Sequence, residues 1–334
     1  MKAETAALKV DDLHVLHHRG DARVALVDGI SFEIGQGEIF GLVGESGSGK
    51  SISALAAVRL LGPDISTLGS VKLDGRELLT LPESEMREVR GGQISMIFQE
   101  PTTALNPVFT VGTQIIAAIR AHLKVSRGEA RKRAEDLLRQ VGIPDPANRL
   151  DFYPHQLSGG MCQRIMIAMA LAAGARLIIA DEPTTALDVT IQADIVKLLQ
   201  ALVRETGVAL LFISHDLGLV AQVCDRVAVA YAGQIVETSD TAMLLRTPMH
   251  PYMQGLIKCV ADFEDVGTVR GGIPGNPPIP GAWPPGCRFQ MRCAFATAGC
   301  EQPQVMREIE SGHLVRCWRA GSLPMHGHSA VAAQ

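Results

Sequence analysis

The sequence has no hydrophobic run long enough to cross a membrane. Its longest apolar stretch is IMIAMALAAGA at 165–175, whereas a membrane-spanning helix needs about 20 consecutive apolar residues. The N-terminal segment MKAETAALKVDD also lacks the apolar core of a secretory signal peptide. We therefore expect a soluble protein of the cytosol.

A surplus of positive charge is also missing. The 31 Lys and Arg residues are outnumbered by 35 Asp and Glu residues, for a formal net charge of -4. This balance gives no electrostatic reason to expect nucleic acid as a partner. The basic run RGEARKR at 127–133 is better explained as a solvated helix face. With 334 residues, 47% of them hydrophobic, the chain can form one large folded domain or two ordinary ones.

Cysteines are few, and their number, seven, is odd. Cys162, Cys224 and Cys259 stand in apolar surroundings and are predicted to pack in the core, because free cysteine is among the most buried residue types. In a reducing compartment, clustered thiols are more often metal ligands or reactive groups than disulfides. The other four thiols gather in the tail, at Cys287, Cys293, Cys300 and Cys317.

A glycine-rich segment follows the first strongly apolar run. In EIFGLVGESGSGKSISALAAVRLLG, residues 38–62, the pattern predicts a strand, a loop and a helix. Residues 44–51 match G-x-x-x-x-G-K-S, whose backbone N–H groups and helix N-terminus bind phosphate oxygens. Lys50 is expected to reach the β- and γ-phosphates, and Ser51 to ligate Mg2+. The other expected contributors to this phosphate-binding loop are Gly44, Ser46, Gly47 and Gly49.

Two adjacent carboxylates end a later apolar strand, in ARLIIADEP at 175–183. Carboxylates at the end of a buried strand are costly unless they meet a cation or a proton-transfer partner. With a phosphate-binding loop upstream, Asp181 is predicted to hold Mg2+ and Glu182 to polarise the water that attacks the γ-phosphate. The chain is therefore expected to be an ATPase or a related nucleotide hydrolase.

A second candidate anion site lies in LSGGMCQR at 157–164. Ser158, Gly159 and Gly160 precede a helical pattern, so they offer a hydroxyl, backbone donors and a helix dipole to a phosphate. Because the first loop already holds one nucleotide, this segment is expected to serve a nucleotide bound on another subunit.

The order of these motifs resembles that of the ATP-binding cassette (ABC) family over residues of about 8–260. The resemblance implies an α/β P-loop ATPase with a helical subdomain at about 106–170, in which two cassettes enclose two ATP molecules. It also implies a role for three further residues. Gln99 in MIFQEP senses Mg2+ and the attacking water, Asp188 in ALD bridges the dimer, and His215 in FISHD contacts the γ-phosphate.

One family feature is replaced in this chain. The family usually stacks adenine on an aromatic residue in the first strand region, where this sequence has LHVLHHRG. His17 is our candidate for that contact, with His18 as the alternative, because an imidazole can stack on a base with less area than Tyr or Phe.

The tail differs in composition from the cassette. Residues 271–286 contain six prolines, at 274, 277, 278, 280, 284 and 285, and must form an extended connector. HPY at 250–252, this connector and the cysteines resemble the C-terminal extension of ATPases from dipeptide and oligopeptide importers, which also include importers of nickel and other small solutes. From packing alone, His250 and Tyr252 are expected only to order a helix start. We divide the chain into an ATPase domain at 1–260 and an extension at 261–334 whose last residues are disordered.

The four tail cysteines stand in a proline-bounded segment that is too small to build a core of its own. Four thiolates on one metal centre would supply the missing cross-link. Their spacing is wider than the close pairs that zinc favours. Similar peptide-importer ATPases carry a 4Fe-4S cluster at such cysteines, so the resemblance implies that Cys287, Cys293, Cys300 and Cys317 ligate one. A Zn2+ site and free thiols are the two alternatives.

The main hypothesis is an importer ATPase bound at the cytoplasmic face of the inner membrane. Its implied partners are two integral-membrane permease subunits, a homologous second ATPase and, indirectly, an extracytoplasmic solute-binding protein; nucleic acid is not among them. Two alternatives are a non-transport ABC ATPase of repair or translation, and a cassette whose tail chiefly senses a metal or ligand.

Overall fold

The structure is a computed structural model that describes residues 6–185, 187–264 and 272–324. The chain forms two compact units. The first is built from residues up to Leu8, Ile34–Glu38 and Asp74–Ile213, and the second from Lys9–Glu33, Ile39–Leu73 and Ser214 onwards. The expected disorder of the last residues concerns 325–334, which lie outside the described residues.

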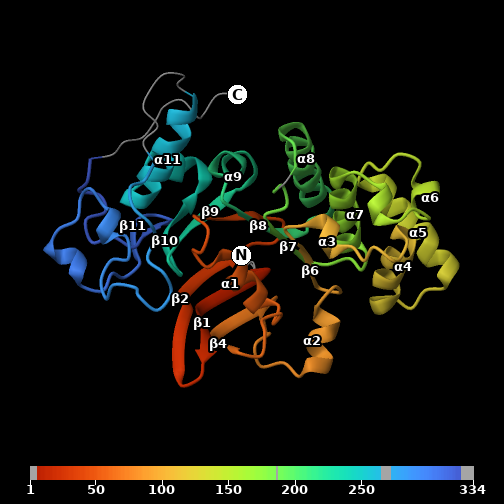
Figure 1. The fold of residues 1–334 in the computed structure, drawn as a ribbon, viewed down its shortest axis with the longest axis horizontal. Helices are drawn as coiled ribbons and strands as arrows, with labels where there is room; N and C mark the ends of the chain where they lie inside the picture. Colours follow the sequence, from red (N-terminus) through yellow and green to blue (C-terminus); the bar gives the residue numbers. More distant parts are fainter. Residues whose placement is uncertain (1–5, 186, 265–271, 325–334) are drawn as a thin grey trace. The chain divides into compact units, whose positions relative to one another are not determined.

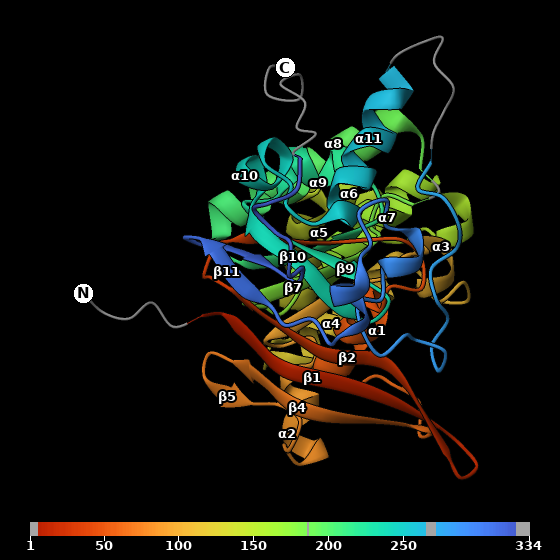
Figure 2. The ribbon, with the colours of Figure 1, turned by 90° about the vertical axis from the view of Figure 1, so that its left-hand side faces the viewer.

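The second unit contains two sheets. Strands β1 (Leu8–Arg19), β2 (Ala22–Ile34) and β4 (Ile65–Leu73) are neighbours in the order β2-β1-β4 and lie side by side in Figure 2. The other sheet is built on β3 (Ile39–Val43), whose five residues are all buried. Such a continuous apolar strand suits a parallel sheet covered on both faces, and β3 pairs in parallel with β9 (Arg226–Tyr231).

The C-terminal extension continues the sheet that carries β3. Strand β10 (Gln234–Asp240) pairs antiparallel with β9 and with β12 (His313–Val315), which in turn pairs with β11 (Arg307–Glu310). The helices of this unit are α1 (Lys50–Ala57), α9 (Leu217–Val223), α10 (Thr241–Arg246) and α11 (Pro251–Glu264), with short 3-10 turns at Gln290–Arg292 and Ala298–Glu301. The predicted domain boundary at 260 falls within α11.

The first unit places helices beside a parallel three-strand core. The order is β8 (Ala209–Ser214), β7 (Leu177–Asp181), β6 (Ile94–Ile97), and both pairings are parallel. The short β5 (Arg76–Glu77) and α2 (Glu83–Val89) precede this core in the chain. Later helices are α3 (Pro101–Ala104), α4 (Val111–His122), α5 (Arg127–Gln140), α6 (Pro146–Arg149), a 3-10 turn at Pro154–Gln156, α7 (Gly159–Leu171) and α8 (Val189–Thr206).

Residues 111–171 of this unit are mostly helical, from α4 to α7. Helices α4, α5 and α7 contact one another (Figure 1). Helix α5 starts with a capping box, in which Ser126 accepts from the backbone N–H of Glu129 and the Glu129 carboxylate accepts from that of Ser126. This pair satisfies two of the donors that a helix start leaves open. Among the described residues, no helix combines the length and apolar character needed to cross a membrane.

Candidate functional site

The phosphate-binding loop connects β3 to α1, as the sequence predicts. Gly49 caps α1 with a left-handed backbone (φ 100°), and Gly47 is also left-handed (φ 78°), conformations that glycine adopts without steric cost. At Gly44 the constraint is a close approach, because a Cβ there would lie 2.1 Å from the backbone oxygen of Ala230. The loop is tied to the β9–β10 turn, where the N–H of Gly233 donates to the oxygen of Ser48 over 2.9 Å.

Lys50 points back into this loop. Its Nζ donates to the backbone oxygens of Gly44 (2.7 Å) and Glu45 (3.0 Å), and its side chain is buried. Ser51 follows in the first turn of α1, while Ser46 and Gly47 are exposed at the loop tip. The ammonium and the helix N-terminus therefore belong to one compact anion-binding element.

Asp181 and Glu182 occupy the carboxyl end of β7 in the first unit. Asp181 is 7% exposed, and Glu182 has a left-handed backbone (φ 47°) whose N–H donates to Ile213 O on β8. The Glu182 carboxylate Oε2 accepts from Gln99 Nε2 (3.1 Å) and from Thr185 Oγ1 (3.0 Å). Because β6 and β7 run in parallel, their carboxyl ends bring Gln99 and Glu182 together.

The LSGGM segment forms the start of α7. Ser158 is the exposed N-cap, and its Oγ accepts from the N–H of Met161 over 3.4 Å. A Cβ at Gly160 would lie 2.9 Å from Ile191 Cγ2 on α8, whereas one at Gly159 would lie 3.7 Å from Leu187 Cδ2. Asp188, the exposed N-cap of α8, follows Leu187 directly. The segment and Asp188 thus belong to one surface of the first unit, while Ala186 lies outside the described residues.

The two predicted histidines lie in the second unit. His215 follows β8 and is exposed, next to Asp216, which caps α9 by accepting from the N–H groups of Gly218 and Leu219. His17, on β1, is half-buried, and its Nδ1 accepts from Arg19 Nε over 3.3 Å. His18 is in hydrogen-bond contact with Ser66 Oγ at 2.7 Å.

The four tail cysteines line one small cavity, of about 10 Å³, together with aromatic and aliphatic side chains. The backbone N–H of Cys287 donates to Cys300 O over 2.7 Å, which closes the loop between them. Burial raises the pKa of Cys287 to about 11, and it also raises the pKa of Cys293 and Cys317. Within the part of the chain that the structure describes, no group of three or more acidic, histidine or cysteine side chains is placed so that it could hold a metal ion.

The HPY segment has contacts that sequence reasoning missed. The hydroxyl of Tyr252 accepts from the backbone N–H of Glu45, in the phosphate-binding loop, over 2.9 Å. His250 is buried, its Nδ1 accepts from the N–H of Tyr252, and burial lowers the pKa of His250 to about 3. Tyr252 thus does more than order a helix start. The contact between Tyr252 and the phosphate-binding loop has no signature in the sequence, because the two segments are 207 residues apart.

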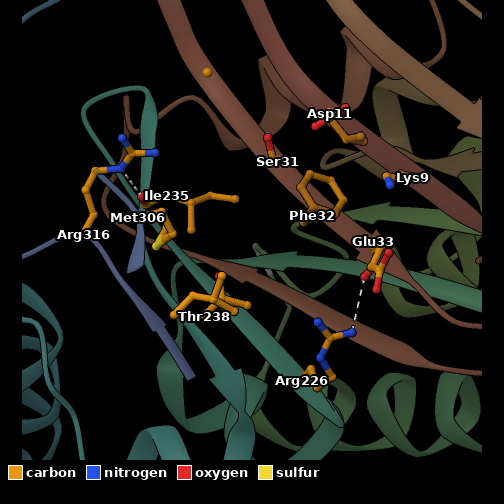
Figure 3. A pocket seen from close by; sticks show the side chains of 13 residues that line it. Lys9, Asp11, Ser31, Phe32, Glu33, Arg226, Ile235, Thr238, Met306 and Arg316 are labelled. Carbon is orange, nitrogen blue, oxygen red and sulfur yellow. Dashed lines mark hydrogen bonds between the residues drawn. The ribbon is translucent and has the colours of Figure 1, made fainter. Parts of the chain in front are cut away.

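A separate cavity of about 390 Å³ lies between β1–β2 and β9–β10 (Figure 3). Its wall includes Phe32, Thr238 and Met306. The guanidinium groups that border it donate to backbone oxygens, Arg226 to Glu33 O (3.5 Å) and Arg316 to Ile235 O (2.9 Å). The cavity is lined by none of the motif residues described above.

Comparison with known families gives two matches. The family described as "ABC transporter" matches residues 27–185, and "Oligopeptide/dipeptide transporter, C-terminal region" matches residues 236–300. The second match begins in β10 and ends at Cys300. The first match covers the phosphate-binding loop, the LSGGM segment and the acidic pair, and the second covers the HPY segment and three of the four tail cysteines.

Curated relatives match over nearly the whole chain. The dipeptide transport ATP-binding protein DppD of Escherichia coli (strain K12) is 47% identical over 319 residues, which covers 93% of this chain and 96% of the relative. The probable peptide ABC transporter ATP-binding protein y4tR of Sinorhizobium fredii is 47% identical over 325 residues, covering 95% of this chain and 96% of the relative.

Solved structures agree on the fold. The ATP-binding cassette MJ0796, in a dimeric post-hydrolysis state bound to ADP and Pi, superposes with a TM-score of 0.63 at 27% identity and covers 70% of this chain and 98% of its own. The predicted α/β P-loop ATPase fold is thus confirmed. On the motifs, the fold and these relatives, the chain belongs to the ABC transporter family, as an ATPase subunit with the oligopeptide/dipeptide transporter C-terminal region.

Proposed function

We propose that this ATPase powers the import of di- or oligopeptides, or of related small solutes. The observation that carries the proposal is the presence, in one chain, of the cassette and the peptide-transporter C-terminal region, at 47% identity to a dipeptide transport ATP-binding protein over 93% of the chain. Several contacts in the structure support particular roles for its residues.

ATP binding is assigned to the phosphate-binding loop. Lys50 neutralises the β- and γ-phosphates, and the backbone N–H groups of the loop, including those of Gly44, Ser46, Gly47 and Gly49, surround them. The Lys50 ammonium already donates within the loop, which supports this role. His17 is proposed to contact adenine.

Mg2+ is assigned to Ser51, Asp181 and Gln99. Hydroxyl, carboxylate and amide oxygens are the hard donors that Mg2+ prefers, so the residue types fit the ion. The bound ion would neutralise charge that develops on the phosphate oxygens. Asp181 is the last residue of β7 and is buried there.

Hydrolysis is assigned to Glu182 as general base. Its carboxylate takes a proton from water, the water oxygen bonds to the γ-phosphorus, and the bond to the ADP oxygen breaks. Gln99 and Thr185 both donate to Glu182 Oε2, which supports a fixed orientation of the base. His215 is proposed to contact the γ-phosphate.

A second ATPase subunit completes the proposal. Ser158, Gly159 and Gly160 act on ATP held by that subunit, and Asp188 bridges the pair. The exposed N-cap hydroxyl and helix start of α7 are a suitable surface for a phosphate carried by another chain. Two integral-membrane permease subunits hold the pair at the cytoplasmic face of the inner membrane, and an extracytoplasmic solute-binding protein delivers the solute to them.

The test of this function is purification from gently solubilised membranes, followed by transport. We expect the tagged chain to co-purify with two multi-span membrane proteins and a second ATPase, and cells that lack it to lose uptake of a labelled dipeptide. Re-expression of the wild-type chain should restore uptake. A chain that purifies without membrane proteins and whose loss leaves peptide uptake unchanged would contradict the proposal.

The tail cysteines are proposed to ligate a 4Fe-4S cluster with a structural role. Cys287, Cys293, Cys300 and Cys317 line one cavity with phenylalanine side chains around it, and four thiols fit a cluster that binds through four separate irons. A bound cluster would supply the covalent cross-links that order this short segment.

Anaerobic purification tests the cluster. We expect a brown protein that absorbs near roughly 400 nm and contains about four irons and four sulfides per chain. Cys293→Ser should bleach it, while Cys224→Ser, a buried cysteine outside the cavity, should leave the spectrum unchanged. A colourless protein with about one zinc per chain after anaerobic purification would show that the cysteines bind zinc and not a cluster.

A further inference from the structure

The cysteine segment reaches the phosphate-binding loop through one arginine. Arg292 immediately precedes Cys293, and its guanidinium meets the carboxylate of Glu45 with two bonds, Nη1 to Oε2 (2.8 Å) and Nη2 to Oε1 (3.0 Å). The Arg292 side chain is 6% exposed and that of Glu45 28%. This bidentate geometry gives the strongest and most directional pairing of these two groups.

The arginine is itself held by the proline connector. Arg292 Nε donates to Pro274 O over 2.9 Å and Nη2 to Ile273 O over 3.3 Å, while Nη1 reaches the hydroxyl of Tyr231 at 3.3 Å. The guanidinium therefore has a fixed position on the extension, and only its Glu45 contact extends to the loop.

Glu45 directly follows Gly44, the first glycine of the phosphate-binding loop. Its backbone N–H donates to Tyr252 and its backbone oxygen accepts from Lys50 Nζ over 3.0 Å. A carboxylate at this position adds negative charge beside a loop whose ligand is a polyanion. Like charges repel most strongly where burial limits solvent screening, so a counter-charge on Glu45 favours nucleotide binding.

We propose that Arg292 is a positioning residue for ATP, which acts by neutralising and orienting Glu45. The extension thereby controls the affinity of the phosphate-binding loop, and loss of order in the cysteine segment weakens nucleotide binding. The proposal rests on the assignment of ATP to the Lys50 loop, but it does not require a cluster at the cysteines.

The test compares Arg292→Gln, Arg292→Lys, Glu45→Gln and the double variant Glu45→Gln/Arg292→Gln in the full chain. Nucleotide Kd is measured with a fluorescent ATP analogue, and KM and kcat in the assembled transporter. Arg131→Gln is the matched control, because Arg131 makes the same bidentate contact with a carboxylate, that of Asp151, outside the extension and the loop.

We expect Arg292→Gln to raise Kd and KM about tenfold at an unchanged kcat, as for loss of a close charge pair. The double variant should return Kd to within about threefold of wild type, because the repelling carboxylate is gone. Arg292→Lys should recover part of the affinity, and Arg131→Gln should bind ATP normally. A purely structural role would instead lower kcat or the folded yield at constant KM.

Two results would overturn the inference. One is an Arg292→Gln chain that binds the analogue as tightly as wild type. The other is a loss of affinity that Glu45→Gln does not relieve. Failure of the wild-type chain to bind ATP at all would instead contradict the assigned ATP site, so the two proposals fail separately.

Discussion

Glu182 combines an unfavourable backbone with a well-held carboxylate. A left-handed conformation at a non-glycine residue costs on the order of 1–3 kcal/mol, and Glu182 has a φ of 47°. The strain is maintained by its N–H bond to Ile213 O and by the two donors to its carboxylate. The strain therefore falls on the residue whose carboxylate we propose as the general base.

The prediction for Glu182→Gln follows from this geometry. The amide preserves the shape of the side chain but cannot take a proton, so ATP should still bind while hydrolysis slows by at least about a hundredfold. Turnover in the assembled transporter and binding of an ATP analogue provide the two measurements. Thr185→Val, which removes only one donor to the carboxylate, should slow turnover far less. Near-normal turnover by the Gln variant would exclude Glu182 as the base.

Two of the three cysteines predicted to pack in the core are buried. Cys162 is 0% and Cys224 is 7% exposed, whereas Cys259 is partly exposed. Burial raises the pKa of Cys162 and of Cys224 above the ordinary thiol value. Since only the thiolate reacts, both should resist alkylation even as the pH rises to the range where free thiols ionise.

Iodoacetamide labelling at about pH 9, near the ordinary thiol pKa, followed by peptide mass spectrometry, measures this. We expect Cys162 and Cys224 to stay unlabelled in the native chain and to react fully in urea. Cys259 serves as the partly exposed comparison within the same sample. If Cys224 reacted as fast in the native chain as in urea, the thiol would not be buried in solution.

At the scale of elements, the Glu237 side chain connects β10 with β12 and with the start of α11. This carboxylate on β10 is fully buried, and it accepts from the N–H groups of Met249 (2.7 Å) and His250 (2.9 Å) just before α11. It is also paired with His313 Nε2 on β12 at 2.7 Å. Burial raises the pKa of Glu237, although each of these partners favours its charged form. The contact attaches both the HPY segment and the extension to the sheet of the phosphate-binding loop.

Glu237→Ala should therefore destabilise the chain strongly. It leaves two backbone donors and a buried histidine without their acceptor, a loss typically worth about 3–5 kcal/mol when a buried charged pair is broken. Urea unfolding at neutral pH gives the measurement. Glu310→Ala, on the exposed part of β11, is the matched control and should change stability by less than about 0.5 kcal/mol. Equal midpoints for the two variants would refute this role of Glu237.

At the scale of the whole molecule, the start of α7 offers a test of the trans assignment. A side chain at Gly160 would meet Ile191 at 2.9 Å within its own subunit, but one at Gly159 has ordinary contact distance to Leu187, 3.7 Å. This chain can therefore accommodate a larger side chain at Gly159, and that side chain would block the phosphate of ATP bound to the partner subunit.

Gly159→Val should leave ATP binding by the isolated chain unchanged and abolish hydrolysis in the partner's site. To distinguish the two sites, turnover is measured in a pair in which only the second ATPase has an intact general base. Gly128→Val, at an exposed helical glycine with open space around it, is the control for valine itself. Loss of ATP binding by the isolated Gly159→Val subunit would argue against action in trans.

The sequence by itself determined the parts whose chemistry is local. Three motifs are local in this sense: the loop at 44–51, the acidic pair at the end of β7 and the capped start of α7. The residues within each motif are near neighbours in the sequence, so turn chemistry and apolar periodicity were enough to predict strand, loop and helix there. The order of these motifs along the chain led to the confirmed family, and the resemblance to that family implied the α/β fold class.

Tertiary structure alone decided how the extension meets the ATPase. Arg292 and Glu45 are 247 residues apart, and His313 and Glu237 are 76 apart. Pairings at such separations leave no period or spacing in the sequence, because they depend on which strand edge the tail joins. The gathering of four cysteines around one cavity has the same cause. It is the pairing of β12 with β10 that carries Cys317 back to the loop containing the other three, and no local pattern specifies that pairing.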